Sequence, residues 1–372
     1  KHRREVLEAC SLALSKLVRR ESRTFTGLAA PVEVHLAAQP GCGDLLEQEA
    51  REKGVEGRRQ GDVLIVQTAD YPALFALRCF EEALIPLGKA PHPPLDGKKS
   101  ALESWAREVV EAASAFPRLL ESSFSGSAPY PYRIELRGLL HSERAPLNHA
   151  LAAAFAQDGR LVNAPSSYDA ELRLQVSGKA TGLYAKLFLP SDPRFSYRLG
   201  TLPASIHPVT AACMMRFAQP YLRAEARVLD PCCGSGTLLV ERAKLMGHGD
   251  LVGVDIASEA VSIARKNIRA SGESVEILGG DLQKFRPRAP FDELIANLPF
   301  GTRVGTHEAN SNLYAVLFER LPQLLSPKGV ALLYTTQRAP MLRLARANGW
   351  KLLGERRFEA GGLQPWALIL SR

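Results

Sequence analysis

A glycine-rich loop in the C-terminal half has the residue types of a ligand-binding turn. The sequence Asp230-Pro-Cys-Cys-Gly234-Ser-Gly236-Thr237 directly follows a predicted strand. Gly234 and Gly236 permit a tight turn and a close approach of the backbone to a ligand, and a helix starting at Thr237 would present free N–H groups there. A dinucleotide-binding loop has a third glycine where this chain has Leu239, and a P-loop has a lysine followed by Ser or Thr. The loop therefore disfavours a dehydrogenase and a nucleoside triphosphatase, while a purely structural turn remains an alternative.

Two carboxylates follow the next two predicted strands. Asp255 and Ile256 end the second strand about twenty residues after the glycine loop, a spacing that lets a carboxylate accept hydrogen bonds from both hydroxyls of a ribose. Asp281 and Leu282 follow the third strand, where a carboxylate could accept a hydrogen bond from an adenine amino group. Each aspartate alone is better explained as an ordinary helix cap. Their order along the chain, each at the end of its strand, favours a site for an adenosyl group.

The fourth motif indicates the reaction. Asn297-Leu298-Pro299-Phe300-Gly ends the fourth strand. The exocyclic amine of a base is a poor nucleophile, and the Asn297 Oδ1 and the Leu298 carbonyl could activate it by accepting its protons. Pro299 has a fixed φ and would hold that carbonyl in place, and Phe300 could stack on an extruded base. The alternative is a plain turn at the end of a strand.

Together these motifs are similar to those of amino-methyltransferases, and nearly the whole chain resembles the THUMP-domain RNA methyltransferases. The resemblance implies S-adenosylmethionine as the cofactor, no metal, and the cofactor-binding residues Asp230, Cys232, Gly234, Ser235, Gly236, Thr237, Asp255, Ile256, Asp281, Leu282 and Asn297. It implies that the catalytic residues at the target base are Asn297, Leu298, Pro299 and Phe300. The segment from Pro203 to Pro208 resembles the one that closes over the cofactor in that family, and we expect its His207 to be structural.

The second residue of the fourth motif separates two substrate classes. Many enzymes that methylate adenine N6 have Asn or Asp, then two prolines and an aromatic residue, whereas this chain has Leu298 in place of the first proline. The motif with leucine resembles the THUMP enzymes that form N2-methylguanosine in the tRNA acceptor stem, and this reaction is the expected function. The alternatives are an N6-adenine or N2-guanine methyltransferase acting on rRNA or DNA, and a non-catalytic RNA-binding protein with a decayed methyltransferase fold. Competent residues in all four motifs argue against decay.

The elements that must position these motifs alternate between strand and helix from Arg227 onward. Such an alternation predicts an α/β fold with a Rossmann-like, doubly wound and mostly parallel sheet, in which ligands bind at the carboxyl ends of the strands. Two further strands, Lys351 to Phe358 and Pro365 to Leu370, are separated by two glycines and predict an antiparallel hairpin at one edge.

The front half of the chain mixes strands and helices and predicts two smaller α+β domains. A tract rich in proline and glycine, Lys89 to Gly97, is the linker candidate. The predicted division is an N-terminal basic helix at 1–30, a ferredoxin-like domain at 31–96, a THUMP-type RNA-binding domain at 97–200, and an S-adenosylmethionine-dependent methyltransferase domain at 201–372. We expect the last of these to bind the cofactor in isolation.

The composition restricts the partners and the compartment. The 372 residues carry a formal net charge of +8, which favours a polyanionic partner, and the expected partner is RNA, most specifically tRNA. The sequence has no apolar run of the ~20 residues that span a bilayer, and no CxxC pair that would suggest a zinc site or a disulfide framework among its six cysteines. We therefore expect a cytoplasmic monomer without a membrane or protein partner. Glu5, Glu8 and Glu21 interrupt the basic N-terminal segment and disfavour a transit peptide.

Overall fold

The computed structural model describes residues 23–178, 180–188, 192–299 and 307–372. The chain divides into two compact units. Unit 1 combines the residues up to Ala29 with Leu87–Pro190, and unit 2 combines Ala30–Pro86 with Ser191–Arg372. The segment predicted as a ferredoxin-like domain therefore shares its compact unit with the methyltransferase segment that begins more than a hundred residues later. Among the described residues, no helix has the length and apolar character needed to cross a bilayer.

The larger part of unit 2 is built on one seven-stranded sheet with the order β11-β10-β9-β12-β13-β15-β14. Strands β9 to β13 pair in parallel, and β15 pairs antiparallel with both β13 and β14. The predicted α/β fold with an antiparallel hairpin at its edge is confirmed. The bounds are α6 Pro208–Ala218, η2 Gln219–Tyr221, β9 Val228–Asp230, α7 Thr237–Leu245, β10 Leu251–Asp255, α8 Ser258–Ser271, β11 Glu276–Gly279, β12 Phe291–Asn297, α9 His307–Leu324, β13 Leu325–Thr335, α10 Arg338–Ala347, β14 Lys351–Arg357 and β15 Trp366–Ser371.

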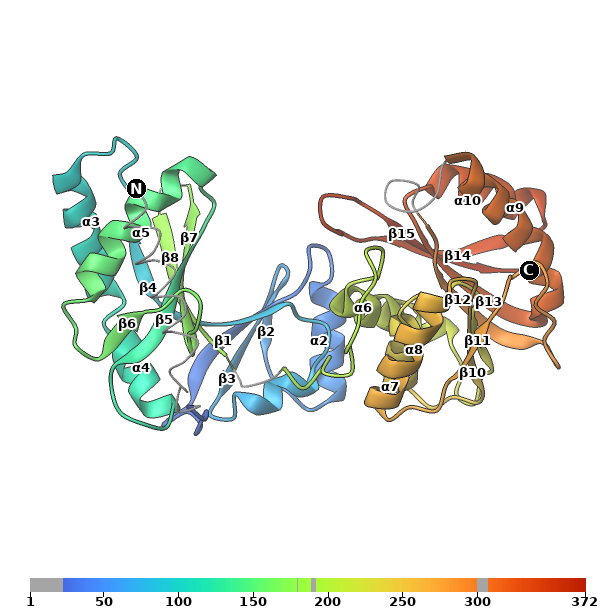
Figure 1. Cartoon of the computed structure of the whole chain (residues 1–372), viewed down its shortest axis with the longest axis horizontal. Helices are drawn as coiled ribbons and strands as arrows, with labels where there is room; N and C mark the ends of the chain where they lie inside the picture. Colours follow the sequence, from blue (N-terminus) through green and yellow to red (C-terminus); the bar gives the residue numbers. More distant parts are fainter. Residues whose placement is uncertain (1–22, 179, 189–191, 300–306) are drawn as a thin grey trace, which may run out of the picture. The chain divides into compact units, whose positions relative to one another are not determined.

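Helices cover both faces of this sheet because successive strand residues point to opposite faces. Val252 and Val254 of β10 belong to the same buried cluster as Phe318 of α9 and Met341 of α10. The residue between the two valines is Gly253, where a β-carbon would lie 2.8 Å from the Leu239 Cδ1 atom of α7. Figure 1 shows the resulting layers, with α7 and α8 on one side of the sheet and α9 and α10 on the other. The glycine thus lets α7, the helix that follows the glycine-rich loop, pack close to the sheet.

The N-terminal part of unit 2 is a small sheet with the order β2-β3-β1-β4, antiparallel throughout. The turn after the first strand, at Gly41 to Gly43, is stabilised by the Asp62 carboxylate, which accepts hydrogen bonds from the N–H groups of Gly41 and Gly43, both at 3.0 Å. A short 3₁₀ helix with Tyr71 as its N-cap lies between the third and fourth strands of this sheet. The elements are β1 Val32–Ala37, α2 Gly43–Glu52, β2 Arg58–Gln60, β3 Val63–Thr68, η1 Pro72–Ala76 and β4 Glu82–Pro91.

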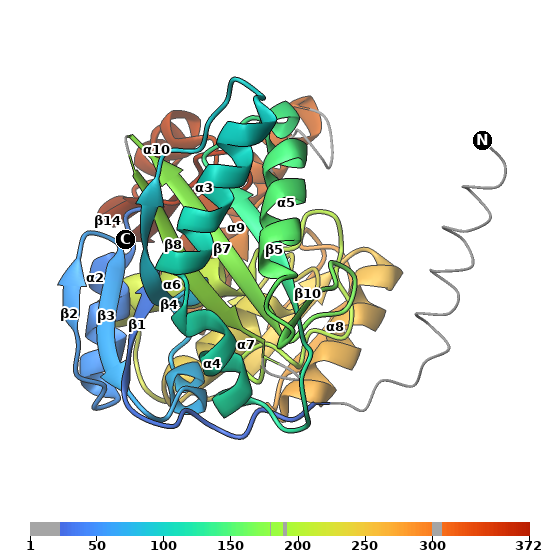
Figure 2. The same ribbon diagram turned by 90° about the vertical axis from the view of Figure 1, so that its left-hand side faces the viewer.

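Unit 1 consists of a sheet with the order β4-β8-β7-β5-β6 and helices on one face. Figure 2 shows α3 and α5 lying side by side over β5, β7 and β8. The buried residues of these strands, among them Leu172, Leu174 and Leu183, provide the apolar side of the sheet. The elements of this unit after β4 are α3 Lys99–Ala112, α4 Ala115–Ser123, β5 Tyr130–Arg137, α5 His141–Phe155, β6 Leu161–Asn163, β7 Ala170–Ser177 and β8 Ala180–Leu187.

The first residues of the segment predicted as a linker, Lys89 to Gly97, form part of a strand in the structure. Strand β4 continues to Pro91, so Lys89, Ala90 and Pro91 belong to a strand and not to a connection. The strand is held at this end because the Pro91 carbonyl accepts hydrogen bonds from Trp105 Nε1 and Thr181 Oγ1, both at 3.0 Å. Composition alone gave no sign of these two partners, which lie far away in the sequence.

Candidate active site

The order of the strands reverses between β9 and β12. Strands β10 and β11 lie on one side of β9 in the sheet. The chain then returns, so that β12 and β13 lie on the other side of β9. Ligands of doubly wound sheets bind where the strand order reverses, beyond the carboxyl ends of the strands. The residues at these ends are Asp230 on β9, Asp255 on β10 and Asn297 on β12. The fold therefore brings three of the predicted site residues to the same edge of one sheet.

The glycine-rich loop adopts the turn that its sequence predicts. Gly234 and Gly236 have φ values of 53° and 77°, in the left-handed region that favours glycine. Gly236 is the N-cap of α7, so Ser235 and Thr237 lie at the start of that helix. The Ser235 hydroxyl is 3.1 Å from the Thr237 hydroxyl and is buried. The helix N-terminus and the turn together form a backbone surface that can approach a ligand closely.

Asp255 connects the glycine-rich loop to the second strand. Its Oδ2 accepts a hydrogen bond from the Gly234 N–H at 2.9 Å, and its Oδ1 accepts one from the Ala257 N–H at 2.9 Å. Ala257 is the N-cap of α8, and that helix has no side-chain cap, so Asp255 does not cap α8 but stabilises the turn that leads into it. A carboxylate has about four acceptor positions, which leaves Asp255 able to accept hydrogen bonds from a ligand as well.

Asp230 is a buried carboxyl group with only 1% of its surface exposed. Its Oδ1 accepts a hydrogen bond from the Cys232 N–H at 3.1 Å. Burial raises the pKa of Asp230 to about 8; the hydrogen bond from Cys232 opposes this change and the nearby Asp255 carboxylate adds to it. No lysine or arginine of the described residues pairs with this carboxyl group. A ligand that brings a positive charge would therefore find an uncompensated buried acid at this position.

Asp281, Leu282 and Ile256 lie around the ends of β10 and β11. The Asp281 Oδ1 accepts a hydrogen bond from the Gln283 N–H at 2.9 Å and so stabilises its own turn. Leu282 is buried, whereas Ile256 is 77% exposed. An apolar side chain with that exposure, directly after Asp255, offers a surface on which a flat apolar ring could pack. Ile256 and Gly279 also line a hollow of about 470 Å³ on the outer side of α8.

Asn297 is held by the segment that precedes α6. Its Nδ2 donates a hydrogen bond to the Ala204 carbonyl at 3.1 Å, which fixes Oδ1 as the free end of the amide. Leu298 donates its N–H to the Tyr334 carbonyl at 3.0 Å, and its side chain is 2% exposed in the core. The Pro299 carbonyl accepts a hydrogen bond from the Tyr314 hydroxyl at 2.6 Å. The turn is thus fixed on three sides, while Phe300 lies outside the described residues and its stacking role stays a prediction.

Three residues that the sequence analysis did not name, Ser205, Asn267 and Tyr314, contribute hydrogen bonds to the site. Asn267 of α8 donates hydrogen bonds from Nδ2 to the carbonyls of Gly200 and Ser235, both at 2.9 Å, and its Oδ1 accepts one from the Gly200 N–H at 3.0 Å. The Ser205 and Ser235 hydroxyls lie 3.1 Å apart. Ser205 belongs to the segment that resembles the cofactor cover, whereas Asn267 and Tyr314 are single polar residues in helices, and no sequence pattern indicates them.

The opposite edge of the sheet has a cavity of about 520 Å³, lined by the first residues of the strands, among them Leu251, Glu276 and Phe291. It is remote from the motifs, because parallel strands place their amino ends at the other edge of the sheet. Among the described residues, no group of three or more His, Cys, Asp or Glu side chains could hold a metal ion.

Comparison with known proteins relates the segment that contains these residues to methyltransferases. Residues 196–365 match the model of the UPF0020 family, described as an RMKL-like methyltransferase domain. A tRNA (guanine(6)-N2)-methyltransferase from Thermus thermophilus is 34% identical over 208 residues, which are 54% of this chain and 60% of that relative. A ribosomal protein L11 methyltransferase from Thermus thermophilus is 32% identical over 187 residues, which are 50% of this chain and 65% of that relative. The chain thus covers less than two thirds of both relatives.

The fold extends the similarity beyond the matched segment. The crystal structure of TrmN from Thermus thermophilus superimposes with a TM-score of 0.68 at 24% identity, covering 91% of this chain and 99% of that one. The predicted Rossmann-like methyltransferase fold is confirmed, and the C-terminal part of the chain resembles methyltransferases in sequence, among them a tRNA guanine-N2 methyltransferase.

Proposed function

We propose that this chain transfers a methyl group from S-adenosylmethionine to the exocyclic N2 of a guanosine in the acceptor stem of tRNA. The observation that carries the proposal is the fixed Asn297 amide. It lies at the carboxyl end of β12, next to the glycine-rich loop, and its donor end is occupied by the Ala204 carbonyl. The acceptor end is therefore the end left for a substrate, as the activation of an amine requires.

The residues around the loop fit the proposed cofactor. The buried Asp230 carboxyl has no cationic partner among the described residues and would lie beside the methionine part, which carries an ammonium group and a sulfonium. Asp255 would accept hydrogen bonds from the ribose hydroxyls, Ile256 and Leu282 would contact the adenine ring, and Asp281 would accept from its amino group. When bound, S-adenosylmethionine supplies the methyl group on a positively charged sulfur.

The chain's own residues would activate the amine. The Asn297 Oδ1 and the Leu298 carbonyl would accept its two N–H groups and so concentrate electron density on the nitrogen as positive charge develops there. No described residue donates a hydrogen bond to the Leu298 carbonyl, while its own N–H is used by Tyr334. Preorganised acceptors of this kind act without reorganisation during the reaction, which is the usual basis of large electrostatic effects.

The residues of the site do not distinguish a nucleic-acid substrate from a protein substrate. Properties of the whole chain favour a nucleic acid. The alignment with the tRNA methyltransferase is longer than that with the ribosomal protein methyltransferase, 208 against 187 residues. The net charge of +8 suits a polyanion. We further propose that residues 97–200 form the RNA-binding domain, and that the protein acts in the cytoplasm as a monomer.

Incubation of the purified chain with radiolabelled S-adenosylmethionine and total cellular RNA, followed by nucleoside analysis, tests the proposal. Label should appear in N2-methylguanosine of the tRNA fraction, and the Asn297→Ala variant should leave that fraction unlabelled. Label in N6-methyladenosine, in rRNA or DNA, or in ribosomal protein added in parallel would contradict the proposed substrate. A chain that binds no S-adenosylmethionine would instead support the decayed-fold alternative.

A further inference from the structure

Residues 192–206, here called the strap, make contacts both with the N-terminal part of unit 2 and with the proposed active site. Near its start, the Arg194 Nη1 donates a hydrogen bond to the Phe80 carbonyl at 2.7 Å, and the Arg194 guanidinium lies 3.9 Å from the centre of the Phe80 ring. In its middle, the backbone of Gly200 makes two hydrogen bonds to Asn267. At its end, Ala204 and Ser205 contact Asn297 and Ser235. The strap therefore contacts both the proposed cofactor loop and the proposed catalytic amide.

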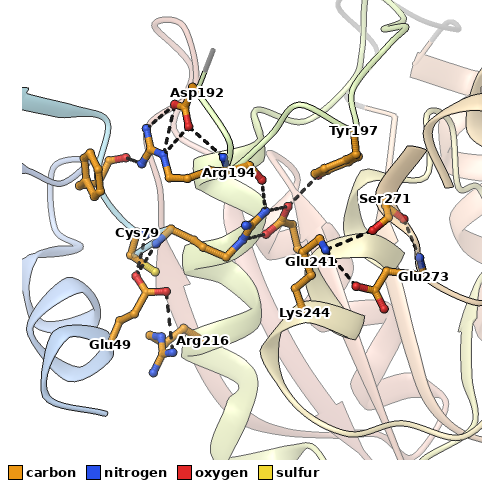
Figure 3. Close-up of polar contacts among 12 residues, drawn as sticks. Glu49, Cys79, Asp192, Arg194, Tyr197, Arg216, Glu241, Lys244, Ser271 and Glu273 are labelled. Atoms are coloured by element: carbon orange, nitrogen blue, oxygen red, sulfur yellow. Dashed lines mark hydrogen bonds and ion pairs between the residues drawn. The ribbon is translucent and has the colours of Figure 1, made fainter. Parts of the chain in front are cut away.

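A buried carboxylate on α7 fixes the strap and the N-terminal part at one point. Arg78 donates two hydrogen bonds to Glu241, from Nε to Oε2 and from Nη2 to Oε1, both at 2.8 Å. The Tyr197 hydroxyl of the strap donates a third to Oε1 at 2.7 Å. Figure 3 shows Tyr197 pointing toward Glu241 across the gap between the strap and the helix. Arg78 also donates a hydrogen bond to the Arg194 carbonyl at 2.7 Å, so one guanidinium contacts both the helix and the strap.

The position of Glu241 in its helix relates this contact to the cofactor loop. Helix α7 begins at Thr237, directly after Gly236, and Glu241 lies about one helical turn further along. The Glu241 side chain is 1% exposed and that of Arg78 is 17% exposed. Burial alone would lower the pKa of Arg78, but the hydrogen bonds to Glu241 raise it above its ordinary value. The Arg78 guanidinium therefore stays charged, and its hydrogen bonds to Glu241 hold the first turn of α7 in place relative to the strap.

We propose that Arg78 is a positioning residue for the cofactor site: through Glu241 and Tyr197 it sets the spacing between the glycine-rich loop and the strap that lies against it. The inference rests on the proposed function. It assigns to the N-terminal part of unit 2 a role in cofactor binding, in addition to any role in docking RNA. Arg78 itself touches neither the cofactor nor the substrate and acts only through the residues that it holds.

The test compares two arginines that join the same parts of unit 2. Arg356 of β14 also makes a bidentate ion pair with the N-terminal part, to Asp44 at 2.8 and 2.6 Å, but it contacts neither α7 nor the strap. The dissociation constant of S-adenosylhomocysteine is measured by calorimetry for the wild-type full chain, for Arg78→Ala and for Arg356→Ala, at a temperature well below each unfolding midpoint. We expect about a 10-fold weaker affinity for Arg78→Ala, the size of effect found when a residue acts on a site through others, and less than a twofold change for Arg356→Ala.

Two further variants keep the test decisive. Arg78→Lys should recover part of the affinity, and Tyr197→Phe, which removes only the hydroxyl that reaches Glu241, should weaken binding in the same direction even if Arg78→Ala does not fold. In methyl transfer, the KM for S-adenosylmethionine should rise in these variants while the KM for tRNA stays constant. Equal effects of Arg78→Ala and Arg356→Ala, or wild-type affinity in Tyr197→Phe, would overturn the inference. A wild-type chain that binds no S-adenosylhomocysteine would overturn the proposed function itself.

Discussion

Asn297 lies at the end of a strand, and its side-chain amide has a fixed orientation that leaves the acceptor oxygen available. The hydrogen bond from its Nδ2 to the Ala204 carbonyl distinguishes it from an aspartate, which has no donor to offer there. The sequence motif predicts the residue but not this partner, because the strap lies 93 residues earlier in the chain. The orientation of the amide is therefore a property of the fold that no local pattern shows.

Asn297→Ala should lower the turnover of methyl transfer by ~100-fold or more, because it removes an acceptor that matters most when charge develops on the amine. The dissociation constant of S-adenosylmethionine should change little. Asn297→Asp is the matched variant: it keeps an acceptor but places a carboxylate oxygen against the Ala204 carbonyl, and it should also lose activity. Cofactor binding that falls in parallel with turnover would place Asn297 in the cofactor site instead of at the substrate.

Asp230 should make cofactor binding dependent on pH. Its folded-state pKa is about 8 against an ordinary value of 3.8, so at neutral pH the free protein holds an extra proton that a cationic ligand must displace. The affinity for S-adenosylmethionine should therefore increase as pH rises from about 6 toward 8, by up to about 10-fold per pH unit for one released proton, and level off above that. In Asp230→Asn, binding should be weaker and this increase should be absent. Calorimetry of both proteins over this range measures it, and a common effect from the cofactor's own amino group cancels in the comparison.

At the scale of single elements, α7 depends on a second buried ion pair. Arg242 is fully buried and donates hydrogen bonds to Glu293 of β12 at 2.7 and 3.1 Å. Its remaining donors reach the carbonyls of Arg223, Met246 and Gly247. Every charge in this pair is compensated, so removal of one partner leaves the other buried and alone.

Arg242→Met should lower the free energy of unfolding by about 3–5 kcal/mol, the range for breaking a buried pair. Lys244→Met is the matched control on the same helix, because Lys244 pairs with Glu273 at 2.9 Å near the surface, with both side chains about a quarter exposed. Pairs of that kind contribute about 0–1 kcal/mol. Denaturant unfolding of both variants compares them directly, and similar losses would mean that the buried pair contributes no more than a surface one.

The elements that could be predicted from the sequence are those whose apolar and polar residues follow a clear strand or helix pattern. The strands of the parallel sheet are short apolar runs, and their order with the intervening helices predicted the fold. Helix α6 was missed because all of its residues except Phe217 are buried, so it has no polar face and no amphipathic period. The three-residue strands β2 and β6 were not predicted, because Arg58–Gln60 is entirely polar and only the first residue of β6 is buried. The predicted site residues could be found because they follow the ends of predicted strands, which meet at one edge of a parallel sheet. Asn267, Tyr314 and the contacts of the strap depend instead on packing between segments that are distant in the sequence.

At the scale of the whole molecule, the two parts of unit 2 are joined by buried polar contacts. A fragment of residues 201–372 would lose Arg78 and Tyr197, the partners of Glu241, together with Gly200, the partner of Asn267. The expectation from the sequence that this fragment binds the cofactor alone therefore needs revision.

We predict that the 201–372 fragment is unfolded or binds S-adenosylhomocysteine at least about 10-fold more weakly than the full chain, since it lacks the residues that hold α7 and Asn267 in place. A chain that lacks residues 87–190, with a flexible Gly/Ser linker in their place, keeps both parts of unit 2 and should retain cofactor binding. This deletion variant should bind tRNA much more weakly, because the proposed RNA-binding domain supplies the phosphate contacts that hold a large RNA. Calorimetry and a filter-binding assay with tRNA separate the two effects, and tRNA affinity equal to that of the full chain would assign RNA binding to unit 2.

The discontinuity of unit 2 also sets an order of events during protein synthesis. Arg78 leaves the ribosome 163 residues before Glu241, and at about 5–20 residues per second this is a delay of roughly ten to thirty seconds. Within that interval the second segment of unit 1, Leu87–Pro190, is made, so unit 1 is complete before the last strands of the large sheet exist. Until then, the apolar side of residues 30–86 has no partner and is a surface that a chaperone can recognise. The first unit of the nascent chain to be completed is therefore unit 1, and the proposed catalytic unit is completed last.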